Sequence, residues 1–410
     1  MKIVVAMDSF KGCLSSREAG EAAAEGIRQV WPEAEVVVRP LADGGEGTVA
    51  ALAEGATERV TVTGPLGEPV ECEYAVIRTR RAAGSEPPTG KESAPAQYFS
   101  ENESSPLAVI ECSGACGLPL VPQQRRNPMY TTTYGLGEVI VDAAAKGCRR
   151  FLIGLGGSAT NDGGAGMLQA LGYRLTDAEG NNIGYGAAGL MRLAAIRKPE
   201  KQSLLTQCTF RVACDVTNPL CGPLGSSAVF GPQKGARTED IQVMDAALRR
   251  YAELVREYCT KRGSAADTDP DTPGSGAAGG LGFAFRAVLG AELLPGSRLV
   301  IEETKLEEYI ADADLVITGE GRLDSQTAMG KAPAAVAAVA QAHGVPVIAL
   351  AGSVEAEKGI LREMGLTAWY GINDRAACDL VTAMQPEVAR RNMAETAAHA
   401  VMELKENGII

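Results

Sequence analysis

The residues best suited to chemistry lie in a turn rich in glycine and hydroxyl groups near the middle of the chain. The segment from Phe151 to Gly166 has the pattern of a short buried strand, a loop and the start of a helix. Glycines let backbone N–H groups approach a ligand closely, and the N-terminus of a helix favours an anion. The pattern therefore predicts a phosphate site, with helix capping by the same polar side chains as the alternative. The candidate phosphate-binding residues are Gly156, Gly157, Ser158, Thr160, Asn161 and Asp162.

Carboxylates recur in similar turns, most of which follow a predicted strand. Phosphoryl transfer uses such parts, because glycine loops and a lysine hold nucleotide phosphates, carboxylates hold Mg²⁺, and one carboxylate orients the attacking hydroxyl. We assign Asp43 to the substrate hydroxyl and Asp215 or Asp324 to the metal, while the opposite assignment and a structural role in turns or caps stay open. The catalytic candidates are Asp43, Lys11, Asp215 and Asp324, and the further nucleotide-binding candidates are Lys234 and Glu320.

The overall charge limits the partners that the chain can bind. The 39 basic and 51 acidic residues give a net charge of −12, which opposes binding to nucleic acid or to an anionic membrane over a broad surface. An anionic substrate therefore needs local positive charge, for which Lys11, Lys234 and Arg322 are the candidates. The 10 cysteines are scattered without zinc-like pairs, and neither a signal peptide nor an apolar run of about 20 residues is present. We therefore expect a soluble protein of the reducing cytoplasm.

Several other catalytic classes lack their motifs. The chain contains no P-loop, no G-x-S-x-G and no H-E-x-x-H, and its two histidines, His343 and His399, are expected to be structural or superficial. The dinucleotide pattern G-x-G-x-x-G/A fits three places, beginning at Gly154, Gly184 and Gly274, which is a weak signal among 48 glycines. An NAD(P)-dependent oxidoreductase acting on a small hydroxy acid remains one alternative, and a non-catalytic small-molecule sensor remains another.

The elements that position these residues have an α/β order. At the start, strands at 2–6 and 35–39 flank a helix that Ser15 and Glu18 begin with a capping box. Near the end, strands at 314–318 and 345–350 flank a loop at 319–327 and a helix at 332–342. Since parallel strands need such crossovers, both ends of the chain are expected to build one lobe. We predict that residues 1–60 with 290–410 form this lobe, that 61–289 form an inserted lobe, and that the active site lies in the cleft between them.

The middle of the chain alternates predicted elements with two loops of low hydrophobicity. Alternation predicts strands within 60–77 around a turn at Gly64–Gly67, and we expect strands at 107–111 and 211–215 with helices at 131–145 and 239–262. Residues 79–106 are rich in Arg, Ser, Glu, Pro and Gly and are expected to be a mobile surface insertion. A second loop rich in Ser, Asp, Gly and Pro is expected at 264–280.

Seven motifs together resemble the bacterial type 1 glycerate kinase family, in that family's order and nearly from end to end. They are the segments Asp8–Gly12, Pro40–Thr48, Arg126–Gly135, Gly154–Gly164, Phe230–Gly235, Gly276–Gly282 and Thr318–Thr327. The resemblance implies ATP-dependent phosphorylation of D-glycerate by a discontinuous two-lobe α/β protein, one lobe of which is flavodoxin-like. The insertion at 79–106 and the loop at 264–273 depart from the family between its motifs, so they affect loop structure rather than chemistry.

We therefore expect a glycerate kinase that uses ATP and Mg²⁺ to make phosphoglycerate, with the 2-phosphate preferred over the 3-phosphate. Its partners are expected to be small molecules, without nucleic acid or membrane. The oligomeric state stays open, a homodimer included.

Overall fold

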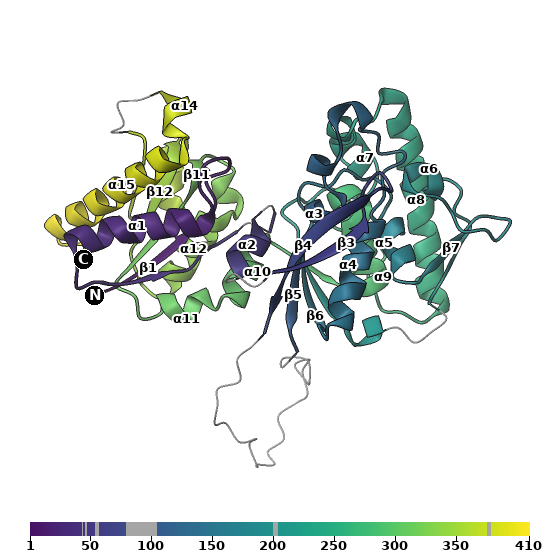
Figure 1. The fold of residues 1–410 in the computed structure, drawn as a ribbon, viewed down its shortest axis with the longest axis horizontal. Helices are drawn as coiled ribbons and strands as arrows, with labels where there is room; N and C mark the ends of the chain where they lie inside the picture. Colours follow the sequence, from purple (N-terminus) through teal and green to yellow (C-terminus); the bar gives the residue numbers. More distant parts are fainter. Residues whose placement is uncertain (43, 46, 54–56, 79–104, 200–203, 375–378) are drawn as a thin grey trace, which may run out of the picture. The chain divides into compact units, whose positions relative to one another are not determined.

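The computed structural model describes residues 1–42, 44–45, 47–53, 57–78, 105–199, 204–374 and 379–410. The chain divides into two compact α/β units (Figure 1), the first made of residues 1–54 and 294–410 and the second of residues 55–293. Asp43 and residues 79–104 of the expected insertion lie outside the described residues. No helix in the described part of the chain is long and apolar enough to cross a membrane.

The first unit is built on a five-stranded sheet. Its order is β13-β12-β11-β1-β2, and its neighbouring strands pair in parallel. Numbered by their order within the unit, the strands run 2-1-3-4-5, which is the doubly wound order of flavodoxin-like sheets, so that prediction is confirmed. The strands are β1 (Lys2–Met7), β2 (Glu35–Val38), β11 (Leu315–Leu323), β12 (Val347–Val354) and β13 (Ala368–Gly371).

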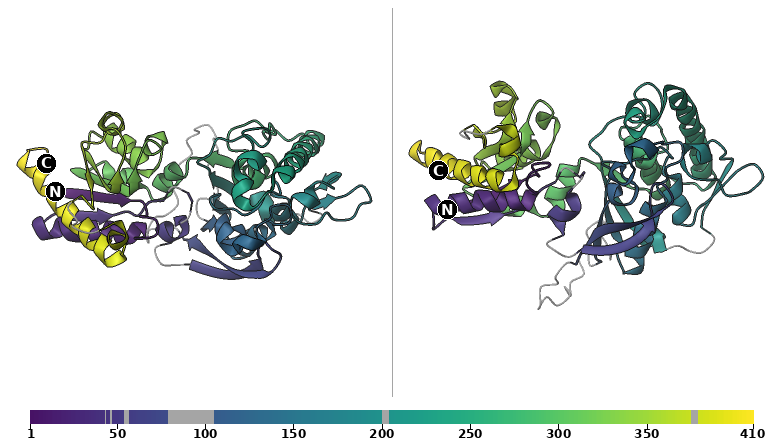
Figure 2. Two further views of the ribbon diagram at one scale, coloured as in Figure 1. Left: turned by 90° about the horizontal axis from the view of Figure 1, so that it is seen from above. Right: turned by 45° about the horizontal axis from the view of Figure 1, so that its top comes forward.

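Helices cover both faces of this sheet. The long helices α1 (Ser16–Val30) and α15 (Pro386–Glu406) lie side by side and share an apolar core with alternate residues of β1 (Figure 2). Helix α12 (Ala332–Ala342) contacts β1, β11 and β12. With both faces covered, β1 is buried from Ile3 to Met7, as expected of a central parallel strand. The shorter helices are α2 (Thr48–Leu52), α10 (Gly296–Glu303), α11 (Leu306–Ile310), α13 (Lys358–Glu363) and α14 (Leu380–Ala383).

Strand β11 is longer than its sequence suggests. We expected it to end at Thr318 before a glycine-rich loop, but it continues through Gly321 to Leu323. The reason is its pairing with β12, which extends from Val316 to Leu323. A Cβ atom on Gly352 would lie 2.5 Å from the carbonyl oxygen of Gly321, so glycine here permits close pairing of two strands rather than a turn.

The second unit contains a six-stranded mixed sheet with the order β10-β9-β6-β5-β4-β3. Strands β5, β6 and β9 are parallel, whereas β3 and β4 form an antiparallel hairpin around Gly67, whose φ is 81°. The predicted hairpin is therefore confirmed. The strands are β3 (Thr57–Thr63), β4 (Pro69–Ile77), β5 (Leu107–Glu111), β6 (Arg150–Gly154), β9 (Thr209–Ala213) and β10 (Glu292–Leu294), and β7 (Arg174–Thr176) pairs with β8 (Ala195–Arg197) apart from this sheet.

One apolar core joins this sheet to the main helices of the second unit. Ile140 of α4, Leu248 of α8 and Phe285 of α9 are all fully buried in it. The helices are α3 (Cys112–Cys116), α4 (Tyr134–Ala145), α5 (Ala165–Ala170), α6 (Gly186–Leu190), α7 (Ser226–Phe230), α8 (Thr238–Lys261) and α9 (Leu281–Leu289). Single 3₁₀ turns occupy 118–120, 123–125, 204–207, 232–234, 277–280 and 327–329.

The start of α1 agrees with the capping signal in the sequence, whereas the start of α4 differs from the prediction. The predicted capping box of α1 is present, since the Ser15 side chain accepts from the Glu18 N–H and the Glu18 side chain accepts from the Ser15 N–H. Helix α4, in contrast, begins at Tyr134 rather than at Thr131. The three preceding threonines are buried. Thr131 and Thr133 donate hydrogen bonds to the loop after β6, and the Thr132 N–H donates to the Pro65 carbonyl oxygen, so all three are held outside the helix.

The contact between α1 and α15 depends on one glycine. A Cβ atom on the buried Gly26 would lie 1.9 Å from the carbonyl oxygen of Ala394. We predict that Gly26→Ala forces the helices apart and lowers the free energy of unfolding by about 1–3 kcal/mol. Chemical denaturation of the full chain measures this.

Gly359→Ala is the matched control, because this glycine also lies in a helix of the first unit and a Cβ there meets open space. It should be neutral or stabilise by up to about 1 kcal/mol through helix propensity. Equal effects of the two substitutions would contradict the packing argument.

Candidate active site

The loop between β6 and α5 has an exposed part and a buried part. Gly156 and Gly157 are exposed, and their N–H groups donate no hydrogen bond to another described residue. Gly157 has a φ of 74°, which favours glycine. The predicted ligands Ser158, Thr160, Asn161 and Asp162, in contrast, are at most 4% exposed. An anion approaching this loop therefore meets backbone N–H groups first.

Asp162 holds this loop between two helices. Its Oδ2 accepts hydrogen bonds from the Thr133 N–H (3.0 Å), the Thr133 hydroxyl (2.9 Å) and the Gly166 N–H (3.2 Å), and its Oδ1 accepts from the Gly164 N–H (3.0 Å). Burial raises the pKa of the carboxyl, and the hydrogen bonds from Thr133, Gly166 and Gly164 oppose that effect. The carboxylate thus satisfies donors at the start of both α4 and α5, which is the capping role considered as the alternative to ligand binding.

Asn161 and Lys234 tie the same loop to α7 and to the turn that follows it. The Asn161 amide donates to the Ser227 hydroxyl at 3.0 Å and accepts from the Ser226 hydroxyl at 3.3 Å. Lys234, which is 2% exposed, donates through Nζ to the Ser158 hydroxyl at 2.9 Å and to the Thr160 carbonyl oxygen at 2.7 Å. Ser158, Thr160 and Asn161 are therefore held by residues that lie more than sixty positions away in the sequence.

A second glycine-rich loop supports the first one from behind. A Cβ on Gly279 would lie 2.0 Å from the Thr160 carbonyl oxygen, and one on Gly280 would lie 2.8 Å from the Gly163 Cα. The Gly163 N–H donates to the Gly279 carbonyl oxygen at 2.9 Å. Both supporting glycines have positive φ values. The motif at 276–282 therefore serves close backbone packing in this structure, and no strand precedes it, so the dinucleotide pattern beginning at Gly274 is not supported.

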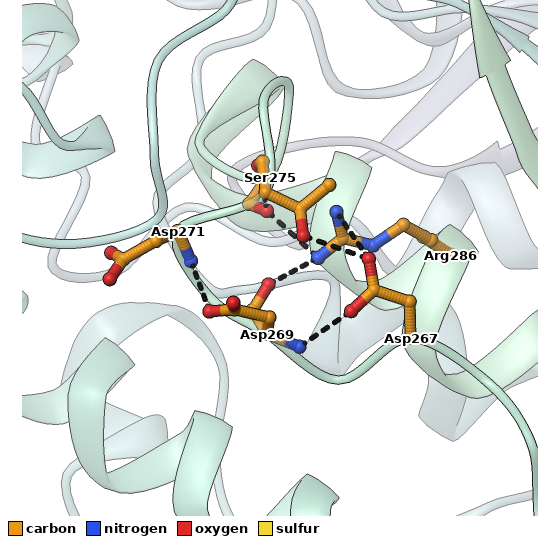
Figure 3. A network of polar contacts seen from close by, with 6 residues as sticks. Asp267, Asp269, Asp271, Ser275 and Arg286 are labelled. Atoms are coloured by element: carbon orange, nitrogen blue, oxygen red, sulfur yellow. Dashed lines mark hydrogen bonds and ion pairs between the residues drawn. The ribbon is translucent and has the colours of Figure 1, made fainter.

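An arginine organises the start of this supporting loop (Figure 3). Arg286 of α9 donates to the Asp269 carbonyl oxygen and to the Ser275 hydroxyl, and its Nη1 lies 3.4 Å from Asp267 Oδ2. A backbone N–H hydrogen bond from Asp269 and the nearby Arg286 lower the pKa of Asp267, against an opposing effect of burial. Since the guanidinium already occupies the centre of this acidic loop, the cluster has its own counter-charge.

Two carboxylates of the second unit lie at the edge of its sheet from which the loop between β6 and α5 emerges. Asp215 is exposed and comes two residues after the end of β9, whose Ala213 pairs with Gly154 of β6. Glu111 ends β5 and pairs with Gly154 from the other side. Glu111 was not among our candidates, although the rule that ligands gather at carboxyl ends of parallel strands would have included it.

The first unit has its own group of polar residues between β1 and β11, where its strand order reverses. The register pairs Met7 of β1 with Gly319 of β11, so Asp8 and Glu320 follow at the same level, and they are 6% and 7% exposed. Glu320 accepts a hydrogen bond of 2.6 Å from the Thr327 hydroxyl. The exposed Lys11 lies on the adjacent turn, where its backbone N would be 3.8 Å from a Cβ on Gly321. Lys11 and Glu320 are thus brought to one edge.

Asp324 lies in the turn after β11 and is partly buried. Burial alone would raise the pKa of Asp324, but the N–H groups of Gln326 and Thr327 with the charges of Lys331 and Arg322 lower it overall. Its Oδ2 lies 3.3 Å from Arg322 Nε. Arg322 therefore supports a carboxylate, and Asp324 is ionised at neutral pH.

The donor chemistry of this edge fits magnesium. Mg²⁺ prefers oxygen ligands and is usually held by one or two carboxylates together with substrate phosphates and water. Asp8, Glu320 and Asp324 offer such oxygens within the first unit. No group of three or more His, Cys, Asp or Glu that could hold a metal by itself occurs among the described residues.

Comparison with known proteins gives one family. A model of the glycerate kinase family matches residues 3–405. The glycerate 2-kinase of Escherichia coli (strain K12) is 44% identical over 376 residues, which cover 91% of this chain and 90% of that protein. The glycerate kinase of Bacillus subtilis (strain 168) is 44% identical over 375 residues, with 91% and 90% coverage. The crystal structure of a putative glycerate kinase 2 from Salmonella typhimurium LT2 matches with a TM-score of 0.83 and 43% identity over 100% of both chains.

The capping role of Asp162 leads to a stability prediction. Asp162→Asn replaces one of the two carboxylate oxygens by an N–H₂ group, which is a donor. That donor then faces either the N–H groups of Thr133 and Gly166 or the N–H group of Gly164. We predict a loss of about 2–4 kcal/mol in the free energy of unfolding, because buried donors lose their acceptor. Thermal unfolding measures it.

The exposed Asp215 provides the matched control, since Asp215→Asn should change the free energy of unfolding by less than about 0.5 kcal/mol. An Asp162→Asn variant that melts like the wild type would assign this carboxylate to ligand contact instead of support.

Proposed function

The chain belongs to the glycerate kinase family, and from this premise we propose that it transfers the γ-phosphate of ATP to the 2-hydroxyl of D-glycerate. The enzyme is an ATP-dependent glycerate kinase. The choice of the 2-hydroxyl rests on the similarity of this chain to the Escherichia coli protein, whose name is glycerate 2-kinase.

The observation that supports the phosphate site is the exposed pair Gly156–Gly157 in a loop whose next residues bind the buried ammonium group of Lys234. Backbone N–H groups bind phosphate oxygens without a side chain between them, and a nearby positive charge favours the anion. Ser158 and Thr160 contribute by holding Lys234 in place. Asn161 and Asp162 shape the loop through their buried hydrogen bonds.

The first unit supplies acidic and basic groups for the reaction. Lys11 is our candidate for contact with an anionic oxygen of the substrates, because it lies exposed on the turn after β1, next to the level at which Asp8 and Glu320 lie on neighbouring segments of the sheet. Asp324 and Glu320 offer carboxylate oxygens to Mg²⁺, and Asp215 is the candidate from the second unit. When bound, the ion would neutralise charge on the phosphate oxygens.

The attacking hydroxyl needs a group that accepts its proton as the new P–O bond forms. Asp43 remains our candidate for this role, and it lies outside the described residues. A positioned carboxylate contributes about 10²- to 10⁴-fold to the rate of such a step. The alternative of a dinucleotide-dependent oxidoreductase is less well supported, because α5 begins at Ala165, well after the glycine pattern that follows β6.

Turnover tests the activity directly. With MgATP and D-glycerate, a coupled assay should detect ADP release, and NMR of the product should identify 2-phosphoglycerate. L-Glycerate serves as the control for the stereochemistry. Formation of 3-phosphoglycerate would contradict the assigned hydroxyl, and absence of turnover on D-glycerate would contradict the activity itself.

Asparagine substitutions separate metal ligands from the base. Asp324→Asn and Asp215→Asn should fold normally and raise the Mg²⁺ concentration needed for half-maximal rate, because a ligand charge is lost. Asp43→Asn should instead lower kcat by about 10²- to 10⁴-fold at saturating Mg²⁺. Near-normal kcat and Mg²⁺ dependence in all three variants would mean that these aspartates are structural.

A further inference from the structure

We propose that Lys234 acts on the nucleotide without touching it, as a positioning residue that holds the Gly156–Thr160 loop in its anion-binding shape and places a positive charge behind it. The proposal rests on the function proposed above, in which this loop receives the phosphates of ATP. It changes the role that the sequence suggested for Lys234, which was direct contact with an anion.

The geometry separates the ammonium group from solvent. Lys234 is 2% exposed, and two of its three donors are used inside the protein, on the Ser158 hydroxyl and the Thr160 carbonyl oxygen. Both acceptors lie within three residues after Gly157, the second of the exposed glycines. Lys234 therefore fixes the conformation of the loop from its inner side, while Gly156 and Gly157 face outward.

The charge of Lys234 has no direct ionic partner among the described residues. The nearest carboxylate that influences it is Asp162, whose oxygens already accept hydrogen bonds from Thr133, Gly164 and Gly166. A buried charge without a paired counter-ion is costly, and its field is screened less than that of a surface charge. An anion bound to the loop would supply the missing counter-charge.

The groups packed around Lys234 determine the pKa of its ammonium group. Helix α3 contributes the thiols of Cys112 and Cys116, the loop after β6 contributes Asp162, and Arg126 lies against the neighbouring Gly235 with its guanidinium toward Val121. Burial lowers the pKa of Lys234 to about 8, while Cys112, Cys116 and Asp162 act in the opposite direction. Since the pKa is lowered, the positive charge is present at pH 7 and is lost as the pH rises through about 8.

The experiment compares the wild type with Lys234→Arg and Lys234→Met between pH 7 and pH 9, with KM for MgATP and kcat measured separately. In the wild type, KM should rise about tenfold across this range as the lysine loses its proton. Lys234→Arg should show a flat profile, because guanidinium stays protonated. Lys234→Met should show a flat profile with KM raised about 10- to 100-fold, the loss of one charge interaction.

Lys261→Met is the matched control, because this lysine of the same unit is 76% exposed in its side chain and forms a surface ion pair with Glu257. It should reproduce the wild-type profile. A wild-type KM that does not change between pH 7 and pH 9, or an arginine variant that follows the wild-type profile, would overturn the proposal, and both readouts remain if the methionine variant does not fold.

Calorimetric binding of ADP over the same pH range distinguishes failure of this proposal from failure of the proposed function. ADP affinity that falls with pH in the wild type but not in Lys234→Arg supports the role of Lys234 even if D-glycerate is not the substrate. Turnover of D-glycerate with pH-independent ADP binding would keep the function and reject this role.

Discussion

The candidate phosphate loop depends on one buried carboxylate. Asp162 accepts four hydrogen bonds from three residues, Thr133, Gly164 and Gly166, which lie at the beginnings of α4 and α5, and through them it orients both helix starts and the loop between β6 and α5. A fully buried carboxylate is tolerated only when such donors replace water. The N–H groups of Gly156 and Gly157 donate no hydrogen bond to another described residue, while the buried half of the loop is fixed by many hydrogen bonds.

Close backbone packing is the second constraint. Gly279 and Gly280 bring one loop against Thr160 and Gly163 at distances that no side chain would allow. The ammonium group of Lys234 is buried and donates to two oxygens of the same loop, the Ser158 hydroxyl and the Thr160 carbonyl. Holding a charge in that position costs stability, and natural proteins accept such costs mainly at functional sites. The loop is thus rigid where it binds the protein and open where it would bind an anion.

In the first unit, topology rather than a single bond gathers the chemical groups. The parallel register of β1 with β11 pairs Met7 with Gly319, so Asp8 and Glu320 lie at the same level although more than three hundred residues separate them. The same rule operates in the second unit, where Glu111, Gly154 and Ala213 end three neighbouring parallel strands. In both units, the strands and turns predicted from the sequence bring candidate residues to one edge of a sheet, and Glu111 is a further residue at such an edge.

The sequence by itself determined the α/β class, the capping box of α1, the hairpin before residue 78 and, through its long motifs, the family. These features are encoded by neighbouring residues, so local periodicity and turn chemistry suffice to predict them. Only the tertiary structure decided which polar residues of the loop face inward, because Thr133, Ser227 and Lys234 become partners of Asp162, Asn161 and Ser158 through folding alone. It also decided that β11 continues past its glycines, since pairing with β12 overrides the local preference for a turn.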